Sequence, residues 1–182
     1  MKFFKYIFIL FLLLGFSIQV KASVSEGTIN AGSHYALLCE DDTCATTSQI
    51  NFLTTSGGIV HVYDNAITGN IWSSKMGWIN LYPSHGGVTN TINGVLGGYA
   101  WGESTGWINF APTHGGVSID TNGNFTGWAW AQNAGWIKFN CAVANACVNT
   151  DWRPVSARPK NGGHPPAPVS VPAPTLLSLI HI

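Results

Sequence analysis

The sequence predicts an all-β protein built from antiparallel hairpin repeats. Its main indication is a unit that recurs every 29 residues, in copies that begin at Ile50, Ile79 and Ile108, with a fourth copy starting at Ile137. The others are the 21 glycines and eight tryptophans, and the Asn-Gly pairs at a constant place in the repeat. The expected architecture is a barrel, a sandwich or a propeller-like array, with a β-solenoid as the alternative.

The N-terminal segment 1–22 has the features of a signal peptide. Lys2 and Lys5 give it a positive start, Tyr6–Phe16 is continuously apolar, and it ends in Val-Lys-Ala. The apolar stretch is well short of the ~20 residues that a membrane-spanning helix needs. We therefore expect an exported protein.

The remaining chain divides into three parts. Residues 23–49 contain no full repeat and are expected to form an N-terminal cap, followed by the Trp- and Gly-rich repeat domain at 50–152. Residues 153–182 are rich in proline, which favours an extended linker and tail. Trp152 is expected to pack as a lid.

Charge excludes one class of partner. The formal net charge is zero and only 9% of the residues are charged. A nucleic-acid-binding surface needs a stripe of lysines and arginines to neutralise phosphates. Eight such residues, some of them in the signal peptide, cannot provide one, so nucleic acid is not an expected partner.

The cysteines occur as two close pairs, one at each end of the repeats. In an exported chain they are most simply two local disulfides, although sequence alone leaves other connectivities and a four-thiolate zinc site open. The acidic loop at 40–42 is a weaker alternative as a calcium site. We expect no metal and no cofactor. The four cysteines are Cys39, Cys44, Cys141 and Cys147.

Within the third copy, alternation predicts a strand over 125–130, a turn, and a second strand over 136–139. Trp128 and Trp130 share one face of the first strand, and Ala129 lies on the other. The turn has hairpin length and contains a glycine.

A third strand is predicted over 117–120, before Asn122-Gly123. This pair and Asn93-Gly94 predict tight type I′ hairpins, because both central residues of that turn have positive φ. The Pro-x-His-Gly-Gly connection is either a wide hairpin or a step to a second sheet. Three hairpins in each repeat would reverse the strand direction from copy to copy, which disfavours a parallel solenoid.

The tryptophans form pairs six residues apart that flank the same turn. We expect most of them to pack in the core or as cross-strand pairs. The alternative is an exposed row of aromatic platforms on which sugar rings stack. The candidate ligand-binding residues for that role are Tyr99, Trp101, Trp128 and Trp130.

No catalytic set recurs in the repeats. His85 and His114 occupy one repeat position without an accompanying carboxylate or third histidine, so they are expected to stabilise a turn rather than bind a metal. Glu103 is the only acid near the tryptophan hairpins, and the next copy has Gln132 in its place. We expect the protein not to be an enzyme.

The segments 98–110 and 127–139, with a degenerate copy at 69–81, resemble the Gly-x-Ala-Trp-x4-Gly-Trp-Ile-x-Phe repeats of exported bacterial proteins of uncharacterised function. The resemblance implies surface localisation and no activity. We therefore expect a secreted or cell-surface structural or adhesive protein. The alternative is a carbohydrate-binding module, and the expected partners are extracellular polysaccharide or further copies of the chain.

The segment 171–177 resembles the start of a PEP-CTERM sorting signal, which implies a Gram-negative bacterium. The hydrophobic helix and basic cluster that follow in that family do not follow here. Residues 177–182 match what a common sequencing-library transposon end encodes in frame. We therefore expect that the natural chain continues beyond residue 176, where a membrane anchor could follow, and the alternative is an ordinary apolar tail.

Overall fold

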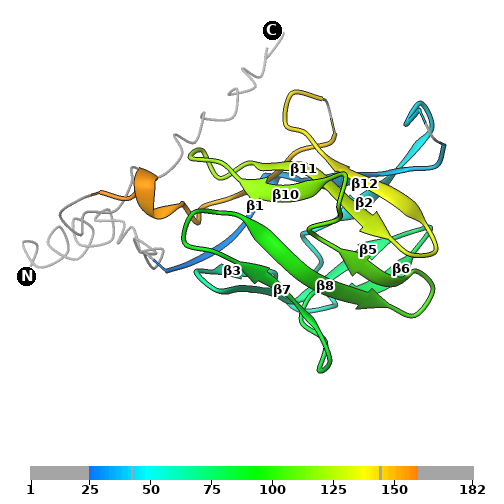
Figure 1. The fold of residues 1–182 in the computed structure, drawn as a ribbon, viewed down its shortest axis with the longest axis horizontal. Helices are drawn as coiled ribbons and strands as arrows, with labels where there is room; N and C mark the ends of the chain where they lie inside the picture. The colour runs from blue at the N-terminus through cyan, green and yellow to red at the C-terminus, as the bar shows by residue number, and fades with distance from the viewer. Residues whose placement is uncertain (1–24, 42, 144, 160–182) are drawn as a thin grey trace, which may run out of the picture.

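The computed structural model describes residues 25–41, 43–143 and 145–159, which fold as one closed antiparallel β-barrel with additional strands (Figure 1). The predicted signal peptide and residues 160–182 lie outside the described residues. The strands are β1 (Glu26–Cys39), β2 (Thr47–Asn51), β3 (His61–Tyr63), β4 (Ala66–Thr68), β5 (Asn70–Ser73), β6 (Gly77–Asn80), β7 (Gly87–Asn90), β8 (Leu96–Gly102), β9 (Gly106–Asn109), β10 (Gly116–Ile119), β11 (Phe125–Ala131), β12 (Gly135–Phe139) and β13 (Val148–Thr150).

Eight strands close the barrel. Going round the ring, each strand pairs antiparallel with the next in the order β1, β2, β5, β6, β8, β9, β11, β12, and β12 pairs with β1 again. The prediction of antiparallel hairpins forming a barrel is confirmed, and the solenoid alternative is wrong. Closure leaves no free edge in this ring, because every strand has a neighbour on both sides.

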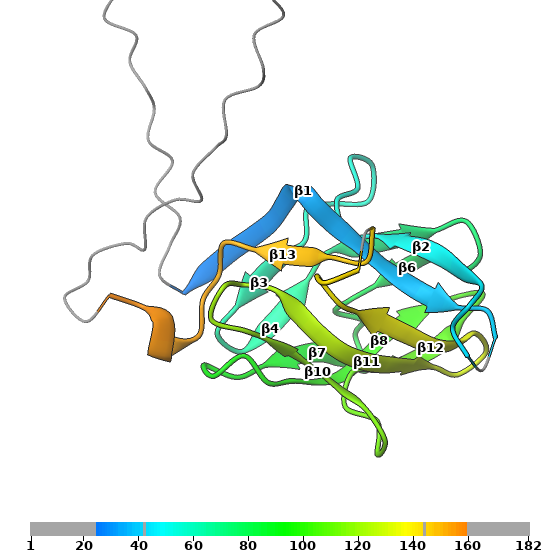
Figure 2. The same cartoon turned by 90° about the horizontal axis from the view of Figure 1, so that it is seen from above.

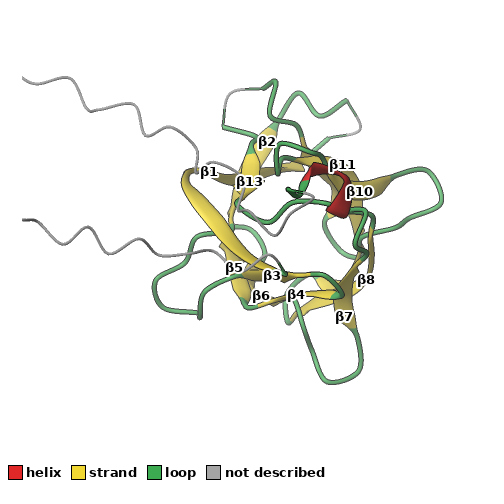
Figure 3. Cartoon of the chain, turned by 90° about the vertical axis from the view of Figure 1, so that its left-hand side faces the viewer, coloured by secondary structure: helices red, strands yellow, loops and turns green. Residues whose placement is uncertain are grey.

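The strands β1, β8 and β11 are long enough to serve two tiers of the barrel (Figure 2). One half of each belongs to the eight-strand ring. The other half pairs with the short strands: β1 with β3 and β13, β8 with β7, and β11 with β10. The pairing of β4 with both β3 and β7 continues this second tier. Figure 3 looks along the barrel from the second-tier end.

Four units build the two tiers, namely β1–β3, β4–β7, β8–β10 and β11–β13, and the first includes the segment that was expected to be a cap. Residues 23–49 supply β1 and most of β2, which form a hairpin like those of the repeats. Ala36 lies opposite Ile50, as Ala100 lies opposite Ile108. This first unit closes the ring because β1 pairs with β12 of the last unit.

The two Asn-Gly hairpins form where predicted, but with a different turn. Gly94 and Gly123 have φ of 83° and 82°, whereas Asn93 and Asn122 are not among the residues with positive φ. The type I′ prediction is therefore wrong. The amide of each glycine donates to the carbonyl three residues earlier, which is the type I turn followed by a left-handed glycine. The Pro-x-His-Gly-Gly segment is the step between tiers, since β9 pairs with β8 and β11 while β10 pairs with β11.

Aromatic rings fill the centre of the barrel. Phe139 is 2% exposed, and its ring centroid lies 5.8 Å from that of Phe52, 6.2 Å from that of Phe110 and 5.9 Å from that of Phe125. Phe52, Phe110 and Phe139 share one repeat position, where the second unit has the buried Leu81. The repeat therefore places one large apolar side chain from each unit at the barrel axis.

The chain crosses the second-tier end of the barrel after β13. Trp152 is 1% exposed, as expected for a lid, and its indole Nε1 donates to Asp64 Oδ1 at 2.9 Å. Arg158 follows the short 3₁₀ helix η1 (Val155–Ala157) and donates to both carboxylate oxygens of Asp64, with Nη1 3.1 Å from Oδ2. These contacts, led by that of Arg158, hold the pKa of Asp64 below its ordinary value. Residues 153–159, expected to be linker, thus belong to the folded domain.

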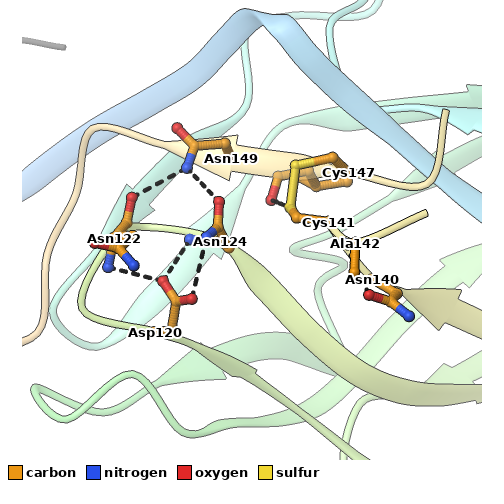
Figure 4. Close-up of a disulfide and its surroundings, with 9 residues drawn as sticks. Asp120, Asn122, Asn124, Asn140, Cys141, Ala142, Cys147 and Asn149 are labelled. Carbon is orange, nitrogen blue, oxygen red and sulfur yellow. Dashed lines mark hydrogen bonds between the residues drawn. A yellow bond between two sulfur atoms is a disulfide. The ribbon is translucent and has the colours of Figure 1, made fainter. Parts of the chain in front are cut away.

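Both disulfides form locally, between Cys39 and Cys44 and between Cys141 and Cys147. Figure 4 shows the second of them. Their Cα–Cα distances are 4.6 Å and 4.1 Å. The local pairing is confirmed, and the other connectivities and the four-thiolate zinc site are excluded. Next to the second disulfide, Asn149 Nδ2 donates to Asn122 O at 3.1 Å and so ties β13 to the β10–β11 turn.

Candidate functional site

The tryptophans lie on the outside of the barrel. Seven of the eight are partly or largely exposed, and only Trp152 is buried. They were expected to pack in the core or as cross-strand pairs: the cross-strand pairing is confirmed, whereas a place in the core is wrong for seven of them. The inward positions of the same hairpins carry smaller side chains, such as Ala100 and Ala129. An eight-strand barrel has an interior just wide enough to be filled by its side chains, so these alanines and the central phenylalanines leave no room for indoles.

The outer aromatic side chains form three clusters, which we call platforms. Platform 1 is on β5 and β6, platform 2 on β8 and β9, and platform 3 on β11 and β12. In each platform, a tryptophan on the first strand of the hairpin lies directly opposite a tryptophan on the second strand. We call the first the outer and the second the inner tryptophan, although both lie on the outside of the barrel. Platforms 2 and 3 have a further aromatic residue. In this order the platforms consist of Trp72 and Trp78; Trp101, Trp107 and Tyr99; and Trp130, Trp136 and Trp128.

The rings meet edge to face in platforms 2 and 3. The Trp101 and Trp107 ring centroids are 4.8 Å apart, and Tyr99 contacts the same indole at 6.2 Å. The corresponding distances from Trp136 are 5.0 Å to Trp130 and 6.2 Å to Trp128. Such packing holds the rings while leaving part of their faces open, since the outer tryptophans are 38% and 40% exposed.

An asparagine from the preceding unit lies on the other side of each outer tryptophan. Asn51 is opposite Trp72, Asn80 is opposite Trp101, and Asn109 is opposite Trp130. The side-chain carbonyl of each asparagine accepts the amide two residues later, at 2.8, 2.8 and 2.9 Å. This contact fixes the side chain, and no Nδ2 group of the three donates to a protein acceptor within the described residues. The result is an Asn-Trp-Trp row that occurs three times.

The first glycine of the Gly-Gly pair makes room for each inner tryptophan. A Cβ added to Gly86 would lie 2.9 Å from Cζ3 of Trp107, and one added to Gly115 would lie 3.0 Å from Cζ3 of Trp136. A Cβ added to Gly57 would likewise clash with the indole of Trp78. The interstrand loop thus lies directly on the indole, and its glycine is required by close packing rather than by the turn.

Replacing Gly115 with alanine is expected to lower the free energy of unfolding by about 1–3 kcal/mol, because the new methyl group overpacks the platform. Its Cβ would lie 3.0 Å from Pro112, from the Trp128 carbonyl and from Trp136. Urea unfolding followed by tryptophan fluorescence measures the change. The matched control is Gly32→Ala, where the nearest atom is at 3.4 Å. Equal stability of the two variants would argue against the tight loop.

Each platform borders a surface hollow. The hollow at platform 1 has about 380 Å³ and is lined by Thr54 and Ser56 as well as by both indoles. The hollow at platform 2 has about 270 Å³ and is lined by Ser84 and His85. At platform 3, His114 and the Cys39–Cys44 loop enclose about 230 Å³. All three combine indole surface with short polar side chains.

Charge distinguishes platform 3 from the others. Lys138 Nζ lies 5.3 Å from the Trp128 ring centroid, a cation–π distance. Asp41 lines the adjacent hollow, and its two oxygens accept hydrogen bonds from Thr43, Ala45 and Thr46. These bonds, with that of the Thr43 hydroxyl foremost, hold the pKa of Asp41 well below its ordinary value. Both oxygens of the carboxylate are thereby hydrogen-bonded within its own loop.

All four candidate residues of the sequence prediction lie on this outer surface. Tyr99 and Trp101 are on β8, and Trp128 and Trp130 are on β11. Asn109 of β9 lies between the two strands, opposite both Tyr99 and Trp130. The structure therefore places the four on two strands, β8 and β11, with only β9 between them.

Other residues of the surface were missed in the sequence. Trp72 and Trp78 are 41% and 46% exposed, and their six-residue spacing was the signal that platform 1 shares with the others. The three asparagines were not singled out, although Ile-Asn recurs at the start of each copy. Their relation to the tryptophans depends on pairing between units, which sequence spacing does not reveal.

The two repeat histidines lie apart, in the hollows of platforms 2 and 3. Among the described residues, no group of three or more His, Cys, Asp or Glu side chains is placed to hold a metal ion. No helix in the same part of the chain is long and apolar enough to span a membrane.

The chain matches no protein-family model, no curated protein and no solved structure. Its fold and surface therefore define the class: a closed β-barrel of four hairpin units that carries three aromatic platforms on its outer face.

Proposed function

We propose that this protein is a non-catalytic module that binds extracellular polysaccharide through its aromatic platforms, at the cell surface or in the medium. One observation carries the proposal, namely the Asn-Trp-Trp row that is repeated three times on the outer face. The outer tryptophans Trp72, Trp101 and Trp130 are 41%, 38% and 40% exposed. Three rings with similar exposure, each between an asparagine and a second tryptophan on the neighbouring strands, indicate a repeated site rather than isolated surface residues.

Polysaccharide is the ligand class that suits this surface. A pyranose ring has a face of C–H groups, which packs on an indole, and a rim of hydroxyl groups, which needs hydrogen-bond partners. The rows offer both, because each outer tryptophan has an asparagine amide beside it. The chain has no net charge, so a neutral polysaccharide fits better than a polyanion.

The structural or adhesive role that the sequence favoured has less support as an independent function. A structural repeat would be expected to bury its tryptophans and to offer a strand edge for self-association. Here the indoles are exposed, and the eight-strand ring is closed. Adhesion follows instead from polysaccharide binding, since a surface protein that binds a matrix glycan attaches the cell to it.

The absence of catalysis is part of the proposal. Glycoside hydrolysis generally uses two carboxyl groups on either side of the bond that is cleaved. Among the described residues, Asp41 lines the hollow at platform 3, whereas Glu103 lines a separate hollow between Trp78 and Trp101. Asp41 is also occupied by its own loop.

Export of the protein fits its cysteines. Both pairs form disulfides, which persist in oxidising compartments and are rare in the cytosol of most organisms. We therefore place the protein outside the cytoplasm, secreted or held at the surface, and a Gram-negative source rests on the resemblance of residues 171–177 to a sorting signal.

Iodide quenching of tryptophan fluorescence tests the function. We expect quenching of most of the emission, because one of the eight indoles is buried, and protection by a neutral polysaccharide from a panel of dextran, laminarin, galactomannan and xylan. Trp101→Ala should weaken binding at platform 2 about tenfold, equivalent to ~1.4 kcal/mol for an aromatic anchor.

Ile92→Ala is the control, because Ile92 is 51% exposed but lies on the β7–β8 turn outside the platforms. It should bind like the wild type. If no polysaccharide protects the fluorescence, or if Trp101→Ala and Ile92→Ala bind equally well, the proposed function is wrong.

A further inference from the structure

The three platforms point in different directions around the barrel. Their strands are consecutive in the closed ring, in the order β5, β6, β8, β9, β11, β12. Two strands four places apart in an eight-strand ring lie on opposite sides. Trp72 on β5 and Trp130 on β11 are related in this way, and Trp101 on β8 lies midway between them.

The interior separates the opposite platforms. Phenylalanine rings fill the barrel axis, with centroid distances of 5.8 to 6.2 Å. A stiff polymer that lies on platform 1 therefore cannot also reach platform 3. Side-by-side platforms on a flat sheet would act on one chain, whereas these are placed to act on separate chains.

The fourth side of the ring has no platform. On β1 and β2, Leu37 and Gln49 occupy the positions of the outer and inner tryptophans, one residue from the buried pair Ala36 and Ile50. Leu37 is only 9% exposed, and Lys138 lies beside it on β12. The number of sites expected from the fold is therefore three, one for each complete Asn-Trp-Trp row.

We propose that the protein is trivalent and cross-links neutral polysaccharide chains. This inference rests on the proposed function and adds to it the number of sites and their directions. The protein joins separate chains of a glycan matrix, with platforms 1 and 3 holding chains on opposite sides of the barrel. Once several chains are joined in a network, the protein leaves it only when all its sites release, so the apparent affinity for the cross-linked polysaccharide rises far above that for a short oligosaccharide.

The test compares a polysaccharide with its own hexasaccharide, using the best-bound member of the panel of dextran, laminarin, galactomannan and xylan. Calorimetry should give three hexasaccharide sites on the purified protein. The polymer should bind about a hundredfold more tightly. When protein is added stepwise to the polysaccharide, light scattering should rise to a maximum as chains become cross-linked. It should fall again in excess protein, when the sites on each chain are filled by separate protein molecules.

Two variants distinguish the effect of the platforms' directions from the effect of the number of sites. Trp101→Ala keeps the two opposite platforms and should still cross-link, with two hexasaccharide sites. The double variant Trp72→Ala with Trp130→Ala keeps one platform, so it should bind one hexasaccharide and lose both the scattering and the hundredfold gain. The double variant Trp72→Tyr with Trp130→Tyr should restore part of the scattering and part of the affinity gain, because an aromatic ring remains at each position. Circular dichroism checks that each variant is folded.

The outcomes distinguish this inference from the function on which it rests. A single hexasaccharide site, or scattering no greater than that of the one-platform variant, would overturn trivalent cross-linking and leave polysaccharide binding intact. Failure of every hexasaccharide and polysaccharide in the panel to bind would overturn both.

Discussion

Replacing Phe139 with alanine is expected to lower the free energy of unfolding by about 3–5 kcal/mol, the usual loss for a large aromatic side chain in a core. Phe139 is 2% exposed and contacts Phe52, Phe110 and Phe125 with ring centroids about 6 Å apart. Phe52 and Phe110 come from other units than Phe139, so the cavity would lie where the units meet. For a domain with a typical stability of ~5–15 kcal/mol, this is a large fraction of the total.

Chemical denaturation with a constant denaturant slope would measure this loss. Phe139→Leu is the matched control, because leucine already occupies the equivalent position 81, and a swap of similar volume generally costs less than ~1.5 kcal/mol. A loss below about 1 kcal/mol for the alanine variant would mean that the units do not depend on this shared cluster.

Replacing Trp152 with alanine is expected to cost a similar ~3–5 kcal/mol, although Trp152 lies outside the repeats. Its indole is buried and donates to Asp64 in the β3–β4 turn, and the Arg158 guanidinium lies 5.3 Å from its ring centroid. Removing the indole would leave a cavity at the second-tier end of the barrel and would leave the Asp64–Arg158 pair without its packing partner.

Trp152→Phe separates the two contributions of this residue. The phenyl ring keeps most of the packing but loses the hydrogen bond to a charged acceptor, so we expect a loss of about 1.5–3 kcal/mol. Thermal and urea unfolding of the two variants give the comparison. If the phenylalanine variant is as unstable as the alanine variant, the hydrogen bond rather than the ring holds this end of the barrel together.

The platforms illustrate how a repeat protein obtains equivalent sites without additional sequence. Each row combines an asparagine of one unit with two tryptophans of the next, and cross-strand pairs of this kind are the unit of sheet stabilisation. One 29-residue pattern thereby encodes both the core and the outer surface. The barrel then distributes the copies around its circumference.

Local chemistry was readable in the sequence wherever the information lay within a few residues. Alternation placed Trp128 and Trp130 on one face of β11 and Phe125 and Ala129 on the other, and burial of the latter two confirms it. The Asn-Gly turns and the two local disulfides also appeared where predicted, because loop length and cysteine spacing limit them.

The choice of the inner face was decided only in three dimensions. Both faces of β11 carry apolar residues, so hydrophobicity by itself could not say whether Trp130 or Ala129 pointed inward. The narrow interior of an eight-strand barrel decided it, since it accepts alanine, isoleucine and phenylalanine and leaves the indoles outside.

Closure of the ring was likewise beyond the sequence. The 29-residue repeat by itself determined the hairpins, their antiparallel sense and the equivalence of the three tryptophan pairs. That segment 23–49 forms the first unit was decided by the pairing of β1 with β12, between Leu37 and Lys138 and between Leu38 and Ile137. Backbone hydrogen bonds make this contact, and they leave no pattern in the side chains by which distant strands could be matched.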